Sequence, residues 1–392
     1  MKQKNQLHIL YIITKLELGG AQKVCLSLLD GMQQSDISAF LISSADGRLV
    51  ATVQGKPNVI LLETLQRDTG IANLFKEIRC FFQLITHIKK LKKQYPYLIV
   101  HTHSTKAGIT GRWAAFFAGV KQRVHTVHGY AFHDHQSKII WLAIYLCELI
   151  TSFITTHFIC VSSADVKTGM RLFPRFAKRH SIIRAAVATE QFFMPAQKLN
   201  DFPGQTEPFV FGTIACFKKQ KNLFDLLNAF AHVHTQNSHT RLEIIGDGPL
   251  RPAIEQWINE HALKNVITLY GWQSSVAPFM MTWHAFVLSS LWEGLPCAII
   301  EARLVKLPVL SYNTGGIHDV ITNGQNGFLY KQKDWQALAN GMLKVAHDKT
   351  LCTKLQSYPD DLHDFDTQQM VQDHIALYRS LRHKHTPDQA AQ

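Results

Sequence analysis

The sequence predicts an α/β protein of two doubly wound domains, each a parallel sheet covered by helices on both faces. The chain has 392 residues, which exceeds the length that a single hydrophobic core usually supports. Short apolar runs alternate with longer amphipathic runs in both halves, the pattern of repeated strand, helix and strand. Between the halves, residues 196–208 concentrate proline, glycine and polar residues and are predicted to form a linker.

Five predicted strands precede the linker, and each is a short apolar run: 8–14, 39–43, 98–101, 123–127 and 158–161. Five more follow it: 209–215, 242–246, 266–270, 285–289 and 309–312. The domains are therefore expected at 1–195 and 209–368. The remaining segment, 369–392, is expected to form a helix followed by a polar tail. Ligands of doubly wound sheets bind outside the carboxyl ends of the strands, here between the facing domains.

The positive charge of the chain is confined to its first half. Residues 1–200 hold 25 Lys and Arg against 11 Asp and Glu, whereas residues 201–392 hold 16 against 18, so the net charges are +14 and −2. Basic clusters such as 89–93 and 171–179 fall on predicted helices, where a solvated face is the default explanation. Because the asymmetry follows the domain division, we favour attraction to an anionic membrane or a phosphate-bearing acceptor.

The seven cysteines are scattered and never form a Cys-x-x-Cys pair, which argues against a disulfide framework or a zinc site and favours a reducing cytosol. The polar start gives no sign of a signal peptide. The longest apolar stretch, 139–161, approaches the ~20 residues that cross a bilayer, but it contains Glu148 and His157. It is predicted to be a buried helix that runs into a strand.

Two glutamates lie on either side of a turn at the end of a predicted strand, in A-F-V-L-S-S-L-W-E-G-L-P-C-A-I-I-E-A. Glu293 falls on the loop that leaves the strand, and Glu301 falls about two turns along the next helix. Both carboxylates can then face the same crevice. The alternative is an ordinary loop carboxylate and a solvated helix residue.

Glycine pairs occupy two strand-to-helix junctions. Gly19 and Gly20 follow the first predicted strand, where backbone can approach a ligand and exposed N–H groups at the helix start favour an anion. Gly246 and Gly248 lie in I-I-G-D-G-P-L-R, before a helix that Pro249 is expected to introduce. Each pair taken alone is also explained by a tight turn.

Histidines and lysines follow other predicted strands. The third is followed by H-T-H-S-T-K, which contains His101, His103 and Lys106, and the fourth by H-T-V-H-G, which contains His128. In the second half, strand 209–215 is followed by C-F-K-K-Q-K. A solvent-facing lysine run is the alternative to a phosphate site there.

Taken in order, these segments resemble the motifs of the retaining glycosyltransferases of family four, in particular bacterial enzymes that build surface polysaccharides. The Glu-x7-Glu spacing, G-G-A-Q, the histidine segments and Y-N-T-G-G-I-H-D-V-I-T-N-G-Q-N-G-F-L carry the resemblance from residue 19 to residue 329. The resemblance implies the GT-B fold, in which an acceptor-side domain and a nucleotide-sugar donor domain, both Rossmann-like, face each other across a cleft. It also implies sugar transfer from a nucleotide diphosphate with retention of anomeric configuration.

The resemblance further implies roles for individual residues. Glu301 is expected to bind the donor ribose, Glu293 a hydroxyl of the transferred sugar, and His128 the sugar and phosphate. Lys221 completes the expected catalytic set with His128 and Glu293. The other expected donor contacts are Gly19, Gly20, Lys218, Gly246, Gly248, Gly294, Leu295, Pro296 and Cys297, and the expected acceptor-side residues are His101, His103 and Lys106.

The chain departs from the family pattern at one phosphate contact. Lys221 matches the family's phosphate-binding lysine, but Cys216 stands where the family usually has an arginine. A neutral thiol cannot replace a cation that binds phosphate. Either Lys218 takes this role, or the donor is held less tightly.

We expect catalysis without a metal or another cofactor. The leaving diphosphate needs cations and N–H dipoles, which Lys221, Lys218 and the helix start after Gly20 can supply. The one Asp-x-Asp, at 364–366, lies after the second domain and away from strand ends. The histidines of 125–135 are not expected to converge on one ion. The leaving phosphate is expected to help deprotonate the acceptor in a front-face mechanism.

The expected donor is a UDP-hexose or a UDP-N-acetylhexosamine, and the expected acceptor is an anionic lipid-linked sugar or glycan of cell-surface or lipopolysaccharide synthesis. The basic first domain is expected to associate peripherally with the cytoplasmic face of the inner membrane. Two alternatives are a nucleotide-sugar epimerase or hydrolase of the same architecture and a non-catalytic basic binding protein. Nucleic acid is not expected as a partner, since no basic stripe is interleaved with aromatic residues.

Overall fold

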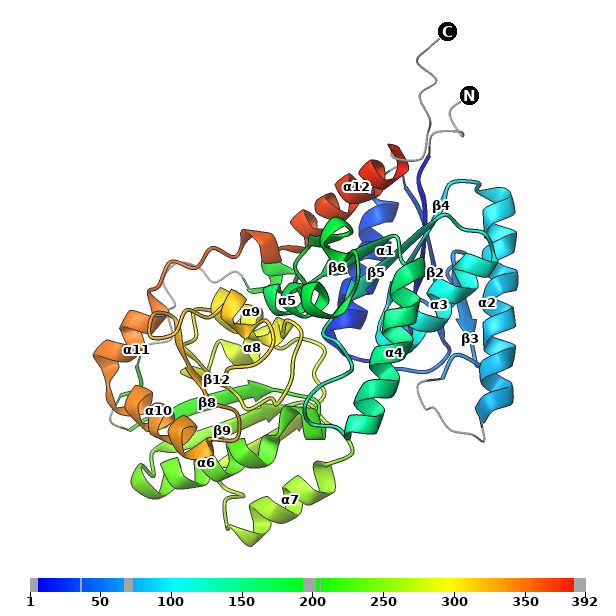
Figure 1. Ribbon diagram of the computed structural model, residues 1–392. Coiled ribbons are helices and arrows are strands. Elements are labelled where there is room, and N and C mark those ends of the chain that lie inside the picture. The colour runs from blue at the N-terminus through cyan, green and yellow to red at the C-terminus, as the bar shows by residue number, and fades with distance from the viewer. Residues whose placement is uncertain (1–5, 36, 67–72, 193–201, 205, 384–392) are drawn as a thin grey trace. The chain divides into compact units, whose positions relative to one another are not determined.

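The structure is a computed structural model that describes residues 6–35, 37–66, 73–192, 202–204 and 206–383 (Figure 1). The chain forms two compact units. Unit 1 comprises Met1–Ala186 and Asp364–Gln392, and unit 2 comprises Val187–His363. Most of the predicted linker at 196–208 and the tail after residue 383 lie outside the described residues.

Unit 1 contains a parallel sheet in the order β3-β2-β1-β4-β5-β6-β7. Its strands are β1 (His8–Ile12), β2 (Ser38–Ser44), β3 (Val59–Leu62), β4 (Leu98–His103), β5 (Gln122–Val127), β6 (His157–Cys160) and β7 (His180–Ile182). The order changes direction between β1 and β4, so the loops after these two strands leave the sheet toward opposite faces. This is the switch point at which doubly wound sheets bind ligands.

The described residues of unit 1 form six helices: α1 (Gly20–Gln33), α2 (Leu74–Gln94), α3 (Thr105–Phe117), α4 (Lys138–Ile154), α5 (Ser163–Leu172) and α12 (Thr367–His383). Right-handed connections place α2, α3 and α4 in one layer, with α3 against β4 and β5 and in contact with both other helices. On the opposite face, α1 lies beside α12 (Figure 1). Gly31 of α1 makes room for this contact, because a Cβ there would lie 2.6 Å from Val371 Cγ2.

The helix α4 is not the buried helix that the sequence predicted for 139–161. Its buried residues are polar: Glu148, Thr151 and Ser152. Its large apolar side chains face outward, and Ile139 is 82% exposed. Hydropathy alone could not reveal this reversal, because the polar residues are buried by partners on another helix. Among the described residues, no helix has both the length and the apolar character needed to cross a membrane.

The partners of the polar face of α4 are on α3. Arg112 is completely buried, and its Nη2 donates to Glu148 Oε2 at 2.7 Å. Its other nitrogens donate to Gly108 O and Thr155 Oγ1. Trp113 Nε1 donates to Thr151 Oγ1 at 3.0 Å. The interface between α3 and α4 is therefore fastened by a buried ion pair and hydrogen bonds.

Unit 2 contains a second parallel sheet in the order β10-β9-β8-β11-β12-β13. Its strands are β8 (Phe209–Ile214), β9 (Thr240–Ile245), β10 (Ile267–Gly271), β11 (Ala285–Leu288), β12 (Val309–Tyr312) and β13 (Gly327–Tyr330). Its helices are α6 (Leu223–Gln236), α7 (Arg251–Glu260), α8 (Ala277–Met280), α9 (Cys297–Leu304), α10 (Trp335–His347) and α11 (Lys349–Gln356). Short 3-10 turns occur in both units: η2 (Val50–Thr52) and η4 (Phe176–Lys178) in unit 1, η5 (Thr189–Phe192), η6 (Lys219–Lys221) and η7 (Ile317–Asp319) in unit 2, and η8 (His363–Phe365) at the boundary. The main apolar core lies where α6 and α10 pack together against the sheet.

All ten predicted strands occur in the structure, and the prediction of two parallel-sheet α/β domains is confirmed. The sequence missed β3, β7 and β13. Each has three or four residues and lies at a sheet edge, where a strand is covered on fewer sides and carries a weaker apolar signal. The third and fourth strands of the prediction are consequently β4 and β5.

We predict that Glu148→Ala lowers the free energy of unfolding by ~3–5 kcal/mol, because it leaves the Arg112 guanidinium buried without its counter-charge. Urea denaturation checks this prediction. Glu255→Ala, which removes an exposed carboxylate from α7, is the control and should change stability by less than ~0.5 kcal/mol. A loss below ~1 kcal/mol for Glu148→Ala would show that the guanidinium finds water or another partner.

Candidate active site

Two strand-end loops of unit 2 meet at Lys221 and Glu293. Lys221 ends η6, after β8, and Glu293 lies on the loop after β11. Because β8 and β11 are parallel neighbours, both loops emerge from the same edge of the sheet. Lys221 Nζ lies 2.5 Å from Glu293 Oε1, and only 18% and 8% of the two side chains are exposed. The structure thus brings together one predicted cation and one predicted carboxylate in a shielded ion pair.

Gln220 and Ser289 hold these loops in place. Gln220 Nε2 donates to Trp292 O at 2.8 Å, and Gln220 O accepts from Leu291 N at 2.8 Å. Ser289 Oγ lies 3.0 Å from the carbonyl oxygens of Lys221 and Asn222. Sequence reasoning missed both residues, since glutamine and serine in loops carry no distinctive signal.

A third loop, after β12, is hydrogen-bonded to the loop that carries Glu293. Gly316 N donates to Gly294 O at 2.6 Å, and Thr314 Oγ1 donates to Leu291 O at 3.2 Å. Gly315 has a φ of +55°, and a Cβ there would lie 2.1 Å from Glu293 O. Glycine is therefore required at position 315 by its positive φ and by the close approach of the Glu293 backbone.

Glu301 lies one turn into α9, not two, because the helix begins at Cys297. It is 7% exposed, which rules out the solvated helix residue of the alternative reading. Gly294, Leu295 and Pro296 are buried ahead of the helix, and Cys297 is half-buried. No side chain among the described residues caps the start of α9, so its first N–H groups and its dipole favour an anion there.

The glycines at 246 and 248 are explained by packing against the loop after β8. A Cβ on Gly246, whose φ is +128°, would lie 1.9 Å from Ala215 O, and one on Gly248 would lie 2.7 Å from Phe217 O. The expectation that Pro249 introduces the next helix was wrong, since α7 begins at Arg251 with Pro252 in its first turn. Backbone packing therefore requires glycine at both positions.

Cys216 and Lys218 are both half-buried in the loop after β8, and Lys218 is the residue that precedes η6. Asn222, which follows η6, adopts a left-handed φ of 48° before α6. Two buried polar atoms in this region, Asn222 Nδ2 and Ser290 Oγ, have no hydrogen-bond partner among the described residues. Buried polar atoms without a partner, on loops at the carboxyl ends of strands, are typical of a site that receives a polar ligand.

In unit 1, the predicted histidines His103 and His128 contact each other. His103 Nδ1 lies 3.0 Å from His128 Nε2, so one ring donates a hydrogen bond to the other. Removal from water lowers the pKa of His128 to about 3 and lowers that of His103 well below its usual value. Both rings are therefore neutral near pH 7, and they can donate or accept hydrogen bonds without carrying charge.

His101 is held by the C-terminal helix. Its Nδ1 lies 2.5 Å from Tyr378 Oη on α12, and its Nε2 lies 2.7 Å from Thr126 Oγ1 on β5. The ring is completely buried, and His374 of α12 stacks 5.7 Å from it. Both ring nitrogens of His101 are therefore used within the protein, and its expected place on the acceptor side stays a prediction.

The remaining predicted residues of unit 1 lie at helix starts. Gly19 precedes the first residue of α1, Gly20, and no side chain in the described part of the chain caps that helix. Lys106 lies in the first turn of α3, where its Nζ contacts Glu77 Oε1 at 2.5 Å and Gln66 O at 2.6 Å. Its ammonium is therefore tied to α2 and the loop before it.

The possible metal ligands have other partners. Asp366 accepts hydrogen bonds from Gln368 N and Gln369 N and so caps the start of α12. His133 Nδ1 accepts from His135 N at 3.2 Å. Within the described residues, no group of three or more His, Cys, Asp or Glu side chains is placed to hold a metal ion.

The chain matches two family descriptions in succession: Glycosyltransferase Family 4 over residues 18–191 and Glycosyl transferases group 1 over residues 197–359. It is 30% identical over 342 residues to the UDP-Gal:alpha-D-GlcNAc-diphosphoundecaprenol alpha-1,3-galactosyltransferase of Escherichia coli, which covers 85% of this chain and 86% of that protein. The chain belongs to glycosyltransferase family four. The chain is also 23% identical over 360 residues to the capsular polysaccharide biosynthesis glycosyltransferase CapM of Staphylococcus aureus, which covers 90% of each chain.

Solved structures with low sequence identity share the fold of this family four chain. The Anabaena protein HepE in complex with UDP superposes with a TM-score of 0.76 at 18% identity, covering 95% of this chain and 100% of HepE. Sucrose-phosphate synthase of Thermosynechococcus elongatus gives 0.78 at 17% identity, covering 96% and 100%. The prediction of a GT-B glycosyltransferase fold is confirmed.

We predict that acid destabilises this glycosyltransferase through its buried histidines. Burial lowers the pKa of His374 to about 4, below the ~6.5 of an unfolded chain, so the unfolded state binds the extra proton. The stability that follows is complete above pH 6.5 and is lost as the pH falls from 6.5 toward 4. Each such histidine contributes a slope of ~1.4 kcal/mol per pH unit.

Urea denaturation between pH 6.5 and 5 measures this slope. His374→Gln should reduce the slope by ~1.4 kcal/mol per pH unit, whereas His232→Gln, which changes an exposed histidine of α6, should leave it unchanged. An equal slope in the wild type and in His374→Gln would mean that this histidine is already protonated in the folded protein.

Proposed function

We propose that this family four enzyme transfers a hexose or an N-acetylhexosamine from a UDP-sugar to a lipid-linked sugar or a growing glycan, with retention of anomeric configuration and without a metal. The observation that carries this proposal is the shielded ion pair between Lys221 and Glu293 at the carboxyl edge of the second sheet. It is supported by the names of similar proteins, which include a UDP-Gal-dependent transferase of Escherichia coli and a structure with bound UDP.

Cleavage of the bond between sugar and diphosphate places negative charge on the leaving phosphate. Lys221 is positioned for this charge because Glu293, Gln220 and Ser289 fix the loop that carries it. Lys218 and the first N–H groups of α9 are proposed to complete the phosphate site. Lys221 and the N–H groups of α9 are held in place by the fold, so little reorganisation of these groups is needed as the charge develops.

The two glutamates take different proposed roles. Glu293, whose Oε1 contacts the Lys221 ammonium, is proposed to accept a hydrogen bond from a hydroxyl of the transferred sugar. Glu301, buried one turn into α9, is proposed to accept a hydrogen bond from the donor ribose. We assign no covalent nucleophile, and the leaving phosphate is proposed to assist removal of the acceptor's proton.

From unit 1, we propose that His128 acts as a neutral hydrogen-bond partner of the sugar or phosphate, oriented by His103. A neutral imidazole can donate one hydrogen bond while the second nitrogen stays with His103. The backbone at Gly19 and Gly20 is proposed to contribute N–H groups to the same substrate. The acceptor is proposed to be presented at the cytoplasmic face of the membrane, with which the enzyme associates peripherally.

UDP-galactose is the first donor to test, together with UDP-glucose and their N-acetylated counterparts. We predict that Lys221→Ala lowers kcat/KM by ~100-fold or more, since a fixed group at the developing charge contributes ~3 kcal/mol. The loss is increased because Glu293 then presents an unpaired carboxylate to the diphosphate. Lys264→Ala, which removes an exposed ammonium of the same unit, is the control.

Near-normal turnover of Lys221→Ala would rule out its role at the phosphate. Lys218→Ala tests whether this residue replaces the arginine that is missing at Cys216, and a raised KM for the donor is expected. Incubation with the donor alone distinguishes transfer from hydrolysis or epimerisation. Rapid release of UDP or a changed sugar without any acceptor would favour those reactions.

Metal dependence is tested separately. We expect full activity in EDTA, because the proposed phosphate contacts are lysine ammonium and backbone N–H groups. Activity that disappears in EDTA and returns with Mn²⁺ would contradict the metal-independent mechanism, while the assignment to the family would be unaffected.

A further inference from the structure

Large apolar side chains are exposed on one layer of unit 1. Among the described residues, the large apolar side chains with high exposure lie in unit 1 with the single exception of Tyr270. Most of them are on three neighbouring helices: Leu74, Phe75, Ile78 and Phe82 of α2, Phe116 and Phe117 of α3, and Ile139, Ile140, Leu142, Leu146, Ile150 and Phe153 of α4. Monomeric proteins rarely leave so large an apolar surface open to water.

The apolar residues of α4 form one stripe. Positions 139, 142, 146, 150 and 153 recur at intervals of three and four residues and therefore share one face of the helix. Their exposed fractions range from 44% to 82%. From residue 139 to residue 154 the only charged residue is Glu148, which is on the opposite, buried face. The outward face of α4 thus carries no charge along four turns.

The apolar surface continues from α4 across α3 to α2. The Phe117 ring meets Phe81 of α2 edge-on, with ring centroids 6.1 Å apart. Phe116 packs against Trp113, which is bonded to Thr151 of α4. On α2, the exposed residues Phe75, Ile78 and Phe82 share one face.

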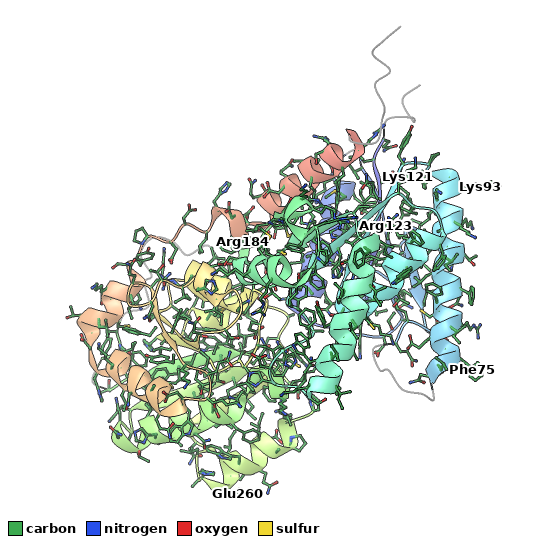
Figure 2. All side chains as sticks on the ribbon, viewed as in Figure 1. Phe75, Lys93, Lys121, Arg123, Arg184 and Glu260 are labelled. Carbon is green, nitrogen blue, oxygen red and sulfur yellow. The ribbon has the colours of Figure 1, made fainter. Side chains whose placement is uncertain are left out.

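Basic residues border this surface. Lys89 and Lys93 continue the exposed face of α2 beyond Phe82, and Lys121 lies after α3. Arg123 lies over the Phe116 ring at 5.5 Å and donates to Ile154 O at the end of α4. Figure 2 shows Phe75 and Lys93 toward opposite ends of α2, with Lys121 and Arg123 toward the Lys93 end.

The charge of the layer is strongly one-sided. Residues 74–154 hold eleven Lys and Arg against three Asp and Glu, a net charge of +8. Two of the three acids, Glu77 and Glu148, are already neutralised by Lys106 and Arg112. The face therefore presents apolar side chains and positive charge together, which is the combination that binds an anionic lipid surface.

We propose that the outward face of α4, with Phe116, Phe117 and the exposed face of α2, docks this glycosyltransferase on an anionic phospholipid bilayer. The helix α4 lies in the plane of the headgroups, its apolar stripe enters the upper acyl region, and the basic residues contact lipid phosphates. Spanning is excluded for α4 because its opposite face holds Glu148 in the protein core. A second copy of the chain is disfavoured, since a symmetric contact would bring the same positive border against itself.

Docking rests on the proposed function, since it would serve to bring the enzyme to a lipid-linked acceptor. The predicted binding, however, needs no sugar transfer. Two contributions to membrane binding are expected. Salt screens the attraction between the basic residues and the lipid phosphates, whereas it leaves the burial of the apolar stripe in place.

Vesicle co-sedimentation of the full chain tests the proposal, with vesicles of phosphatidylcholine mixed with phosphatidylglycerol. The test variant is Ile139→Ser, Leu142→Ser, Leu146→Ser and Ile150→Ser combined. The matched control, Met170→Ser, Ile182→Ser and Tyr270→Ser combined, changes exposed apolar residues elsewhere. We expect the test variant to bind at least ~100-fold more weakly and the control to bind like the wild type.

The charge contribution has its own pair of variants. Lys89→Gln with Lys93→Gln should weaken binding roughly tenfold, and Lys264→Gln with Lys349→Gln should not weaken it. Raised salt should reduce binding of the wild type to a residual level that the α4 serine variant lacks. Binding of the α4 variant equal to that of the wild type overturns the proposal.

A second measurement reports the position of α4 directly. Cys147 lies exposed on this helix, and in a Cys216→Ser, Cys297→Ser background it can carry an environment-sensitive fluorophore. The emission should shift to the blue when anionic vesicles are added. An unchanged emission with bound vesicles would place another face on the membrane.

Two controls separate the outcomes. Retained stabilisation by UDP and retained transfer to a water-soluble acceptor show that the α4 variant is folded, so a loss confined to vesicle binding supports docking. Vesicle binding without any transferase activity of the wild type would instead refute the proposed function and leave docking intact. A wild-type dimer that the α4 variant makes monomeric, without vesicle binding by either, would assign the face to a second copy and overturn the proposal.

Discussion

The parallel pairing of β8 with β11 is the constraint on which the candidate active site depends. Parallel neighbours deliver their following loops to one edge of the sheet, and here those loops carry Lys221 and Glu293. The contact between these two groups is shielded from water, so the ion pair is stronger than one on the surface. Gln220, Ser289 and Gly315 are then best understood as residues that keep the two loops in register.

Unit 1 uses buried polar groups in a different way. Its histidines at the ends of β4 and β5 are kept neutral by burial, and one of them, His101, is tied to the C-terminal helix through Tyr378. The segment 364–383 therefore completes the core of the first unit, although it follows the second along the chain. The same unit buries Arg112 with Glu148 and thereby turns the polar side of α4 inward. Because the polar side of α4 is bound to α3, the apolar side of α4 is left on the outside.

Much of the site was predictable because its chemistry is local in the sequence. Strand ends followed by Gly-Gly, Lys or Glu identify the loops of a doubly wound sheet. The spacing of Glu293 and Glu301 placed the first on the loop after a strand and the second on the next helix. The start of α9 was misplaced by one turn, since Pro296 could end the loop or begin the helix and only the backbone distinguishes these cases. Gln220 could not be found, because its importance lies in a hydrogen bond to a residue 72 positions away. At Cys216 the chain still departs from the family pattern.

The sequence by itself determined the two α/β domains, ten of their strands, the asymmetry of charge and the family, because these depend on periodicity, composition and short motifs. Tertiary structure decided which polar residues are buried with partners. It paired Lys221 with Glu293, gave both ring nitrogens of His101 hydrogen-bond partners and placed the apolar stripe of α4 on the outside. The physical reason is that burial of a charged or polar group is favourable only when a partner from a distant part of the chain is present. Hydropathy along the chain records the side chain and not that partner.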